Sequence, residues 1–219
     1  MRRKGFYNYC NRLQEWEIMA IDRELIIREM SKLEIRGNED GLIPAFGVFV
    51  QQLPSEIWTS FSERLTRYVS DELVETVEWV LVAAAQECGY HTGYGIITSE
   101  EWNAIVAPMI ENGAEDVLKG AFAVLTAWGW GKAEIHELIP GEKMVIRLYD
   151  SYESDAVEYG SSNKPSVYTV TGVCAAFMDL AYGGAYDVTG KTGLKTFTAK
   201  QTKGLECGDY YSEIVVTKA

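Results

Sequence analysis

The chain has 219 residues, a hydrophobic content of 47% and a formal net charge of −12 at pH 7. This length and apolar content are enough to bury one full core, so we expect a single domain. A surface this acidic excludes nucleic acid as a partner, because phosphate binding needs clustered Lys and Arg. The one basic cluster, "MRRK" at residues 1–4, is too short to change this expectation.

The apolar runs and the cysteines of the sequence indicate the cellular compartment of the protein. The sequence has no long uncharged apolar run and its N-terminus lacks the apolar segment of a signal peptide. We therefore expect a cytoplasmic protein with no membrane span. The four cysteines, Cys10, Cys88, Cys174 and Cys207, are scattered and form no CxxC pair. Without an export signal, free thiols are expected rather than disulfides.

Helical patterns dominate the first half of the chain. Residues 11–34 carry an apolar stripe and predict an amphipathic helix followed by a loop. Residues 54–89 open with Pro and Ser, which suit a helix start, and predict a longer helix. The apolar stripe of this second helix consists of Phe61, Leu65, Tyr68, Val69, Leu73, Val77, Val80 and Ala84.

Glycines, a capping box and a proline divide the next part of the chain. The glycine-rich stretch "ECGYHTGYG" at residues 87–95 predicts the end of the long helix. Thr98 and Glu101 match a capping box and predict that a new helix begins there. Pro108 is expected to kink or end it. Residues 114–131 repeat the helical spacing until two glycines break it.

The pattern changes to strands after Gly131. Residues 132–153 alternate polar and apolar on both sides of "PGE" and predict a β-hairpin. Residues 153–165 read as a polar loop, and the apolar residues 166–184 as a buried helix. Residues 194–219 predict two strands around the turn "ECGD". Helices first and antiparallel strands later indicate an α+β fold, with a sheet of about four strands packed against helices.

This order of elements resembles the 4-vinyl reductase domain family. The resemblance lies in a hairpin that runs into a Ser-x-Glu stretch at Ser151 and Glu153, a helix centred on Gly172, and a terminal strand introduced by Gly208 and Asp209. Members include sensing domains of phenol- and xylene-responsive transcription activators, a protein needed for bacteriochlorophyll vinyl reduction and, distantly, vesicle-tethering subunits. The family members are sensing, accessory and assembly proteins.

The resemblance covers residues 114 to 218. We therefore divide the single domain into a helical N-terminal segment, residues 1–113, and a 4-vinyl reductase-like ligand-binding core, residues 114–219. The resemblance implies a helix-backed antiparallel sheet with an interior pocket for a small apolar or aromatic ligand, often in a homodimer. We predict a sensor, carrier or accessory protein whose output runs through a partner protein or through delivery of the ligand.

A metal site is implied for the aromatic-sensing relatives but not for this chain. In those relatives zinc is held by cysteines and an acidic residue near the pocket. The matching positions here are Val167, Gln201, Gly204 and Ser212. None of these suits zinc, which prefers thiolate, imidazole or carboxylate ligands. We therefore expect no metal and no cofactor.

Aromatic residues gather in the elements that line the pocket of the resembling family. Aromatic walls with a few polar groups suit a planar or hydrocarbon ligand, although any one ring can also serve packing alone. The relatives that sense phenol orient its hydroxyl with a His and a Trp, and the nearest positions here are around Phe122 and Leu148, so phenol itself is not expected. His136, Arg147 and Tyr149 are the candidate polar groups. The full set of candidate ligand-binding residues is Phe122, Trp128, Trp130, His136, Arg147, Tyr149, Tyr152, Tyr168 and Phe177.

Two other functions stay open. One is a small hydrolase-type enzyme, similar to thiazoline-carboxylate hydrolases, that uses a pocket thiol or carboxylate. The other is a protein-assembly module with a filled core. Cys88 and His91 form the one candidate Cys-His pair, whereas Cys174 is expected to be buried. Glu206 and Asp209 should raise the pKa of Cys207.

Carboxylates and glycines give no second site. The carboxylates of Asp150, Glu153, Asp155 and Glu158 are expected to lie in solvent, as charge runs on loops usually do. The glycine-rich stretches lack the spacing of phosphate-binding loops, so no nucleotide is expected. We predict no catalytic residue.

Overall fold

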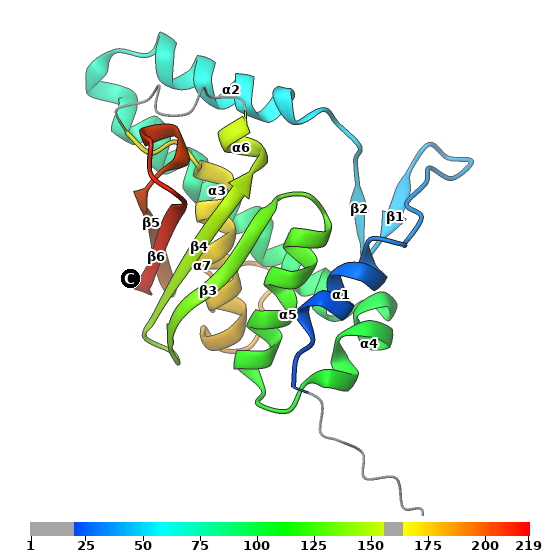
Figure 1. Cartoon of the computed structure of the whole chain (residues 1–219). Helices are drawn as coiled ribbons and strands as arrows, with labels where there is room; N and C mark the ends of the chain where they lie inside the picture. Colours follow the sequence, from blue (N-terminus) through cyan, green and yellow to red (C-terminus); the bar gives the residue numbers. More distant parts are fainter. Residues whose placement is uncertain (1–19, 156–163) are drawn as a thin grey trace, which may run out of the picture.

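A four-stranded antiparallel sheet and the helices packed against it form the body of the molecule (Figure 1). The computed structural model describes residues 20–155 and 164–219. The helices are α1 (Arg23–Met30), α2 (Ser55–Tyr68), α3 (Asp71–Ile97), α4 (Glu100–Ile105), η1 (Ala107–Met109), α5 (Ala114–Ala127), α6 (Tyr152–Asp155), α7 (Tyr168–Tyr182) and η2 (Leu205–Cys207). The strands are β1 (Ile43–Ala45), β2 (Val48–Val50), β3 (Gly131–Ile139), β4 (Lys143–Ser151), β5 (Phe197–Lys203) and β6 (Ser212–Lys218). The predicted α+β fold with a helical N-terminal half is confirmed.

The sheet has the strand order β3-β4-β6-β5. Met144, Ile146 and Leu148 on β4 are fully buried, because every second residue of a strand faces the same side. Helix α5 packs on β3, while α7 packs on β5 and β6. The core therefore lies between one face of the sheet and these two helices.

Both predicted strand pairs are confirmed. In the β3–β4 hairpin Ile139 pairs with Lys143, and the Glu142 N–H donates to the Ile139 carbonyl at 3.0 Å. Gly141, in the turn, has a φ of 71°, which glycine adopts without steric cost. Strands β5 and β6 flank the "ECGD" turn, of which η2 forms the first part.

Helix α7 is the apolar centre of the fold, and the predicted buried helix at residues 166–184 is confirmed. Cys174, Ala175 and Ala176 are completely inaccessible to solvent. A helix that is apolar on all sides belongs in the interior. It lies there between α3 and the sheet.

Asp179, fully buried on α7, joins three elements through hydrogen bonds. Its carboxylate accepts from Gln86 Nε2 on α3 at 2.7 Å and from the backbone N–H groups of Phe197 and Lys195, each at 2.9 Å. Gln86 Nε2 also donates to the Phe197 carbonyl. Burial raises the pKa of Asp179, while these hydrogen bonds oppose the rise.

Helix α3 does not stop at the glycine-rich stretch, so the predicted end at residues 87–95 is wrong. The helix continues to Ile97, and two of its glycines, Gly89 and Gly93, lie in close contact with α7. A Cβ added to Gly89 would lie 3.1 Å from Ala176 Cβ, and one added to Gly93 would lie 2.7 Å from a methyl group of Leu180. Here glycine permits close approach to α7 instead of ending the helix.

The other helix boundaries also need correction. The single helix predicted over residues 54–89 is two helices, because the chain is extended at Val69, with a φ of −91° and a ψ of 160°. The new helix at residue 98 is capped by Ser99, whose hydroxyl accepts from the Trp102 N–H, while Thr98 ends α3. Pro108 lies in the 3₁₀ turn η1, where α4 has already ended, as expected. Helix α1 covers part of residues 11–34, of which 11–19 lie outside the described residues.

A short hairpin, β1–β2, lies in a segment predicted to be a loop. Its two-residue turn consists of Phe46 and Gly47, with φ values of 54° and 70°. Positive φ at both central positions is typical of tight hairpin turns but uncommon for an aromatic residue. The Phe46 ring is buried edge-on against Trp128, with ring centroids 4.4 Å apart, and this packing offsets the backbone strain.

Glu153 is buried, which corrects the expectation that this carboxylate lies in solvent. Its two oxygens accept from the N–H groups of Thr169 and Val170 at 2.8 and 2.9 Å. These are otherwise unpaired donors in the first turn of α7, so Glu153 caps that helix from α6. Burial raises the pKa of Glu153, while these hydrogen bonds oppose the rise. Glu158 lies outside the described residues, and Asp150 is exposed.

Replacement of Gly172 on α7 by Ala should destabilise the protein. The new Cβ would lie 2.4 Å from the Val82 carbonyl oxygen and 2.7 Å from Gln86 N, and this helix backbone cannot move away cheaply. We expect the free energy of unfolding to fall by about 1–3 kcal/mol, the usual cost of overpacking. Urea denaturation measures it. In the control Gly37→Ala the nearest atom is 3.9 Å away, and equal stability of the two variants would refute a tight α3–α7 contact.

Candidate functional site

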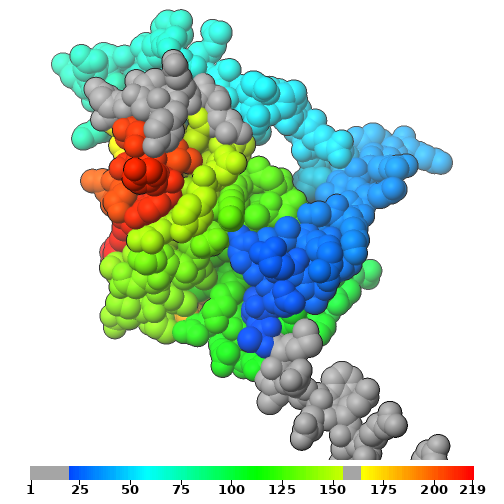
Figure 2. Space-filling view, in the orientation of Figure 1, coloured from blue at the N-terminus to red at the C-terminus, as the bar shows by residue number. Residues whose placement is uncertain are grey.

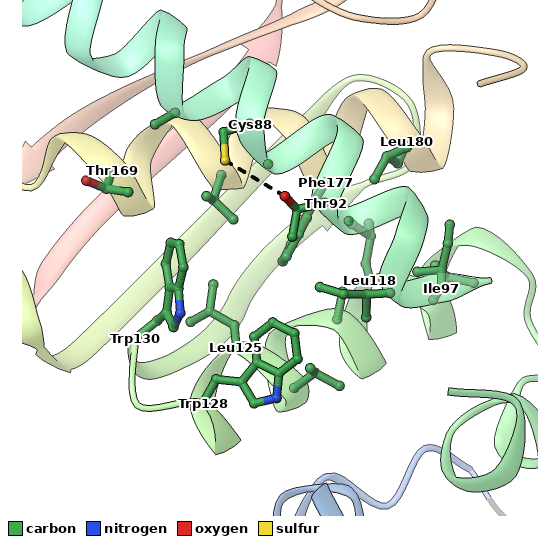
Figure 3. A pocket seen from close by; sticks show the side chains of 18 residues that line it. Cys88, Thr92, Ile97, Leu118, Leu125, Trp128, Trp130, Thr169, Phe177 and Leu180 are labelled. Carbon is green, nitrogen blue, oxygen red and sulfur yellow. Dashed lines mark hydrogen bonds between the residues drawn. The ribbon is translucent and has the colours of Figure 1, made fainter. Parts of the chain in front are cut away.

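An apolar cavity of about 150 Å³ lies between α3, α5 and α7 (Figure 3). Residues of all three helices line it, and the turn after α5 adds two indole rings. The lining residues are Ala85, Cys88, Gly89, Thr92, Gly93, Ile96, Ile97, Val117, Leu118, Ala121, Val124, Leu125, Trp128, Trp130, Thr169, Val173, Phe177 and Leu180. The site therefore combines helices that are far apart in the sequence.

Small side chains make room for this cavity. Gly89 and Gly93 lie one turn apart on α3, and Ala121 lies on α5. Larger residues, among them Leu125, Phe177 and Leu180, form other parts of the wall. Residues three or four apart share one side of a helix, so each helix presents a continuous strip to the cavity.

Few polar groups reach the lining. Cys88 is exposed and its Sγ lies 3.8 Å from Thr92 Oγ1. Thr169 lines the cavity from the first turn of α7, and its side chain forms a hydrogen bond with Glu153. Trp128 contributes an indole whose Nε1 is buried and has no hydrogen-bond partner in the described part of the chain. A buried unpaired donor costs free energy, and this one is not accessible from the cavity.

Three predicted ligand-binding residues line the cavity: Trp128, Trp130 and Phe177. Two more lie directly behind them. Phe122 is buried with its ring centroid 5.2 Å from that of Phe177, and Tyr152 lies 6.0 Å from Trp130 by the same measure. The structure thus brings together five of the nine predicted side chains.

Four predicted residues lie elsewhere. His136 is exposed on β3. Arg147 and Tyr149 alternate with the buried residues of β4 and so lie on the outer face of the sheet, where the Arg147 guanidinium lies 4.6 Å from the centroid of the Tyr211 ring. Tyr168 is buried at the start of α7 and donates to Glu78 Oε1 at 2.8 Å. None of the four lines the cavity.

The sequence interpretation missed the wall contributed by α3. Seven lining residues come from this helix, between Ala85 and Ile97. Ala85, Gly89 and Gly93 recur at every fourth position. This spacing is typical of a closely packed helix face, and it is the signal that could have revealed the wall.

The cysteines differ in accessibility. Burial raises the pKa of the fully buried Cys174 thiol, so Cys174 is not a nucleophile. Burial, then Glu206 and Asp209, raise the pKa of Cys207, which confirms the direction expected from the sequence. His91 Nδ1 lies 2.9 Å from the Tyr186 hydroxyl. Cys10 lies outside the described residues.

The four positions that match the relatives' zinc ligands all make hydrogen bonds, among them that from the Gly204 N–H to Asp209 Oδ2 at 2.9 Å. The Val167 N–H donates to Gln201 Oε1 at 2.8 Å, and Gln201 Nε2 donates to the buried Glu206 at 3.0 Å. The Ser212 hydroxyl accepts from the Leu205 N–H at 3.3 Å. This network attaches the start of α7 to β5. Within the described ranges, no three His, Cys, Asp or Glu side chains gather as metal ligands.

The geometry defines a helix-covered antiparallel sheet with an apolar cavity, and two solved structures share this fold. The phenol-responsive sensory domain of the transcription activator PoxR, solved with phenol, has 15% sequence identity and a TM-score of 0.57, over 87% of this chain and 89% of that one. A trafficking protein particle complex subunit 3 from Naegleria fowleri, covalently bound to palmitic acid, has 15% sequence identity and a TM-score of 0.51. The match covers 75% of this chain and 95% of that one. The predicted relation to an aromatic-sensing domain is confirmed at the level of the fold.

Sequence comparison adds nothing to this relation. The chain matches no protein-family model, and no curated protein matches it. Within the described residues, no helix combines the length and the apolar character needed to cross a bilayer.

Proposed function

We propose that the protein binds one small apolar or aromatic molecule in the cavity between α3, α5 and α7, as a sensor, carrier or accessory protein. The observation that carries the proposal is the cavity itself, whose wall is almost entirely apolar. An apolar protein cavity of about 150 Å³ stays dry and accepts a benzene-sized molecule. The proposal includes a relation to the 4-vinyl reductase domain family and a cytoplasmic location, both as expected from the sequence.

The solved structures of the same fold support this ligand class. One was solved with phenol, and the other is covalently bound to palmitic acid. One aromatic ring and one acyl chain are both apolar bodies with a single polar end. The apolar wall of the cavity described above suits the apolar body of either molecule.

Filling the cavity should weaken binding. Ala121→Leu on α5 adds three carbon atoms to the wall, so we expect the affinity for toluene to fall about tenfold or more, because a filled cavity must repack before a ring can enter. Isothermal titration calorimetry with toluene measures this loss.

The matched control is Ala104→Leu on α4, which adds the same atoms to an exposed helix position. It should bind toluene like the original chain. Equal binding by both variants would place the ligand elsewhere, and no binding by any of the proteins would reject an aromatic ligand.

Covalent attachment of an acyl chain at Cys88 is a second candidate function. Cys88 is exposed and lines the cavity, and a protein of the same fold carries covalently bound palmitic acid. Cys88 Sγ would attack the carbonyl carbon of an acyl-coenzyme A, the coenzyme A thiol would leave with the proton of Cys88, and a new thioester would form. The acyl tail would then occupy the cavity.

Mass spectrometry after incubation with octanoyl-coenzyme A tests this attachment. We expect the mass to rise by one octanoyl group that hydroxylamine removes, and we expect no rise for Cys88→Ser. Cys207→Ser should behave like the original chain, because burial and neighbouring carboxylates raise the pKa of that thiol. Equal acylation of Cys88→Ser would reject the site.

A further inference from the structure

One buried side chain attaches the β1–β2 hairpin to the body of the molecule. Among residues 43–50 only Phe46 is buried, whereas Phe49 on β2 is 70% exposed. Figure 1 shows both strands projecting from the body, and Figure 2 shows an open gap between the body and the segment that leads from β2 into α2. A two-stranded hairpin has little stability of its own, so the position of this hairpin depends on the contacts of Phe46.

Phe46 is connected to the cavity through the side chain of Trp128. The two rings meet edge-on, with their centroids 4.4 Å apart. Trp128 lines the cavity and Phe46 does not, so the indole lies between Phe46 and the cavity. A change in the position of this indole therefore changes the packing of the Phe46 ring.

A second contact joins the hairpin to the cavity wall. A Cβ added to Gly95 on α3 would lie 2.6 Å from Val48 Cγ1 and 3.3 Å from the Phe46 carbonyl oxygen, so the hairpin packs directly on the last turn of α3. Ile96 and Ile97 in the same turn line the cavity. The hairpin thus contacts the wall at the ends of both α3 and α5.

We propose that the β1–β2 hairpin responds to occupancy of the cavity, and that a ligand in the cavity stabilises the docked position of the hairpin. This inference rests on the proposed function. The φ of 54° strains the backbone at Phe46, so the docked position is favoured only while packing on Trp128 offsets the strain. Without a ligand the indole lacks packing contacts on its cavity side. A ligand supplies these contacts and holds the indole against Phe46.

The ligand shifts the hairpin because it interacts differently with the docked and the released state. When Phe46 leaves Trp128, the indole is free to turn into the cavity and fill part of it. A bound ligand excludes this movement, so it favours the docked state. Residues 51–54 join β2 to α2, so a docked hairpin also fixes the place where α2 begins.

Hydrogen exchange of the original chain with and without saturating toluene tests the proposal, and calorimetric titration of the same sample establishes binding. We expect the backbone amides of residues 43–50 to exchange about threefold or more slowly with toluene, because the ligand raises the population of the docked hairpin. Amides of residues 187–193, which lie outside the cavity lining, should not change. Toluene binding without slower exchange of the hairpin would overturn this inference and leave the proposed function standing. The absence of toluene binding would reject an aromatic ligand and, with it, this inference.

Two variants of the hairpin give a matched comparison. Phe46→Asn removes the ring behind Trp128 and leaves an Asn-Gly turn, which suits a tight hairpin. Its hairpin exchange should no longer respond to toluene, and its toluene affinity should fall about threefold or more, because docking and binding support each other. Phe49→Thr removes an exposed ring from β2, and it should keep both the affinity and the response. A response that survives in Phe46→Asn, or is lost in Phe49→Thr, would contradict transmission through Phe46 and Trp128.

Discussion

Two helices approach as closely as α3 and α7 only where the facing residues have almost no side chain. Gly89 and Gly172 meet this requirement, and at Gly172 a single added carbon would lie 2.4 Å from the backbone of α3. Because α7 is enclosed by α3 on one side and the sheet on the other, this contact sets the position of the sheet relative to the N-terminal helices. The cavity forms beside it, where α5 and the larger side chains of α7 hold the helices apart.

Elements with an unambiguous period were predictable from the sequence. The hairpin around residues 140–142, the helix at 166–184 and the terminal strands follow from alternation, apolar content and turn residues. The path of α3 was not predictable in the same way, because a glycine can end a helix or permit close packing, and only the neighbouring helix decides between the two. The boundary at Val69 likewise depends on where α2 and α3 pack.

The candidate site was predictable only in part, for a related reason. Trp128, Trp130 and Phe177 were predicted because large aromatic residues suggest a ligand pocket. The small residues of α3 were missed because they contribute to the cavity only by lacking large side chains. Arg147 and Tyr149 were attributed to the pocket although they alternate with Ile146, which faces the core. Successive residues of a strand face opposite sides of the sheet, so Arg147 and Tyr149 lie on the face away from the core. The alternating sequence pattern of the strand would have predicted this.

The glycines that let α3 pack closely also lower the intrinsic helix stability of its last turns. Each glycine in a helix interior costs about 1 kcal/mol relative to alanine, and Gly89, Gly93 and Gly95 fall within two turns. Segments of low local stability open first in the native state, without unfolding of the whole molecule. The same turns carry Thr92, Ile96 and Ile97, which line the cavity. If this wall opens locally, a molecule gains a route in and out of the cavity, and the residence time of a bound ligand then depends on how often the end of α3 unfolds.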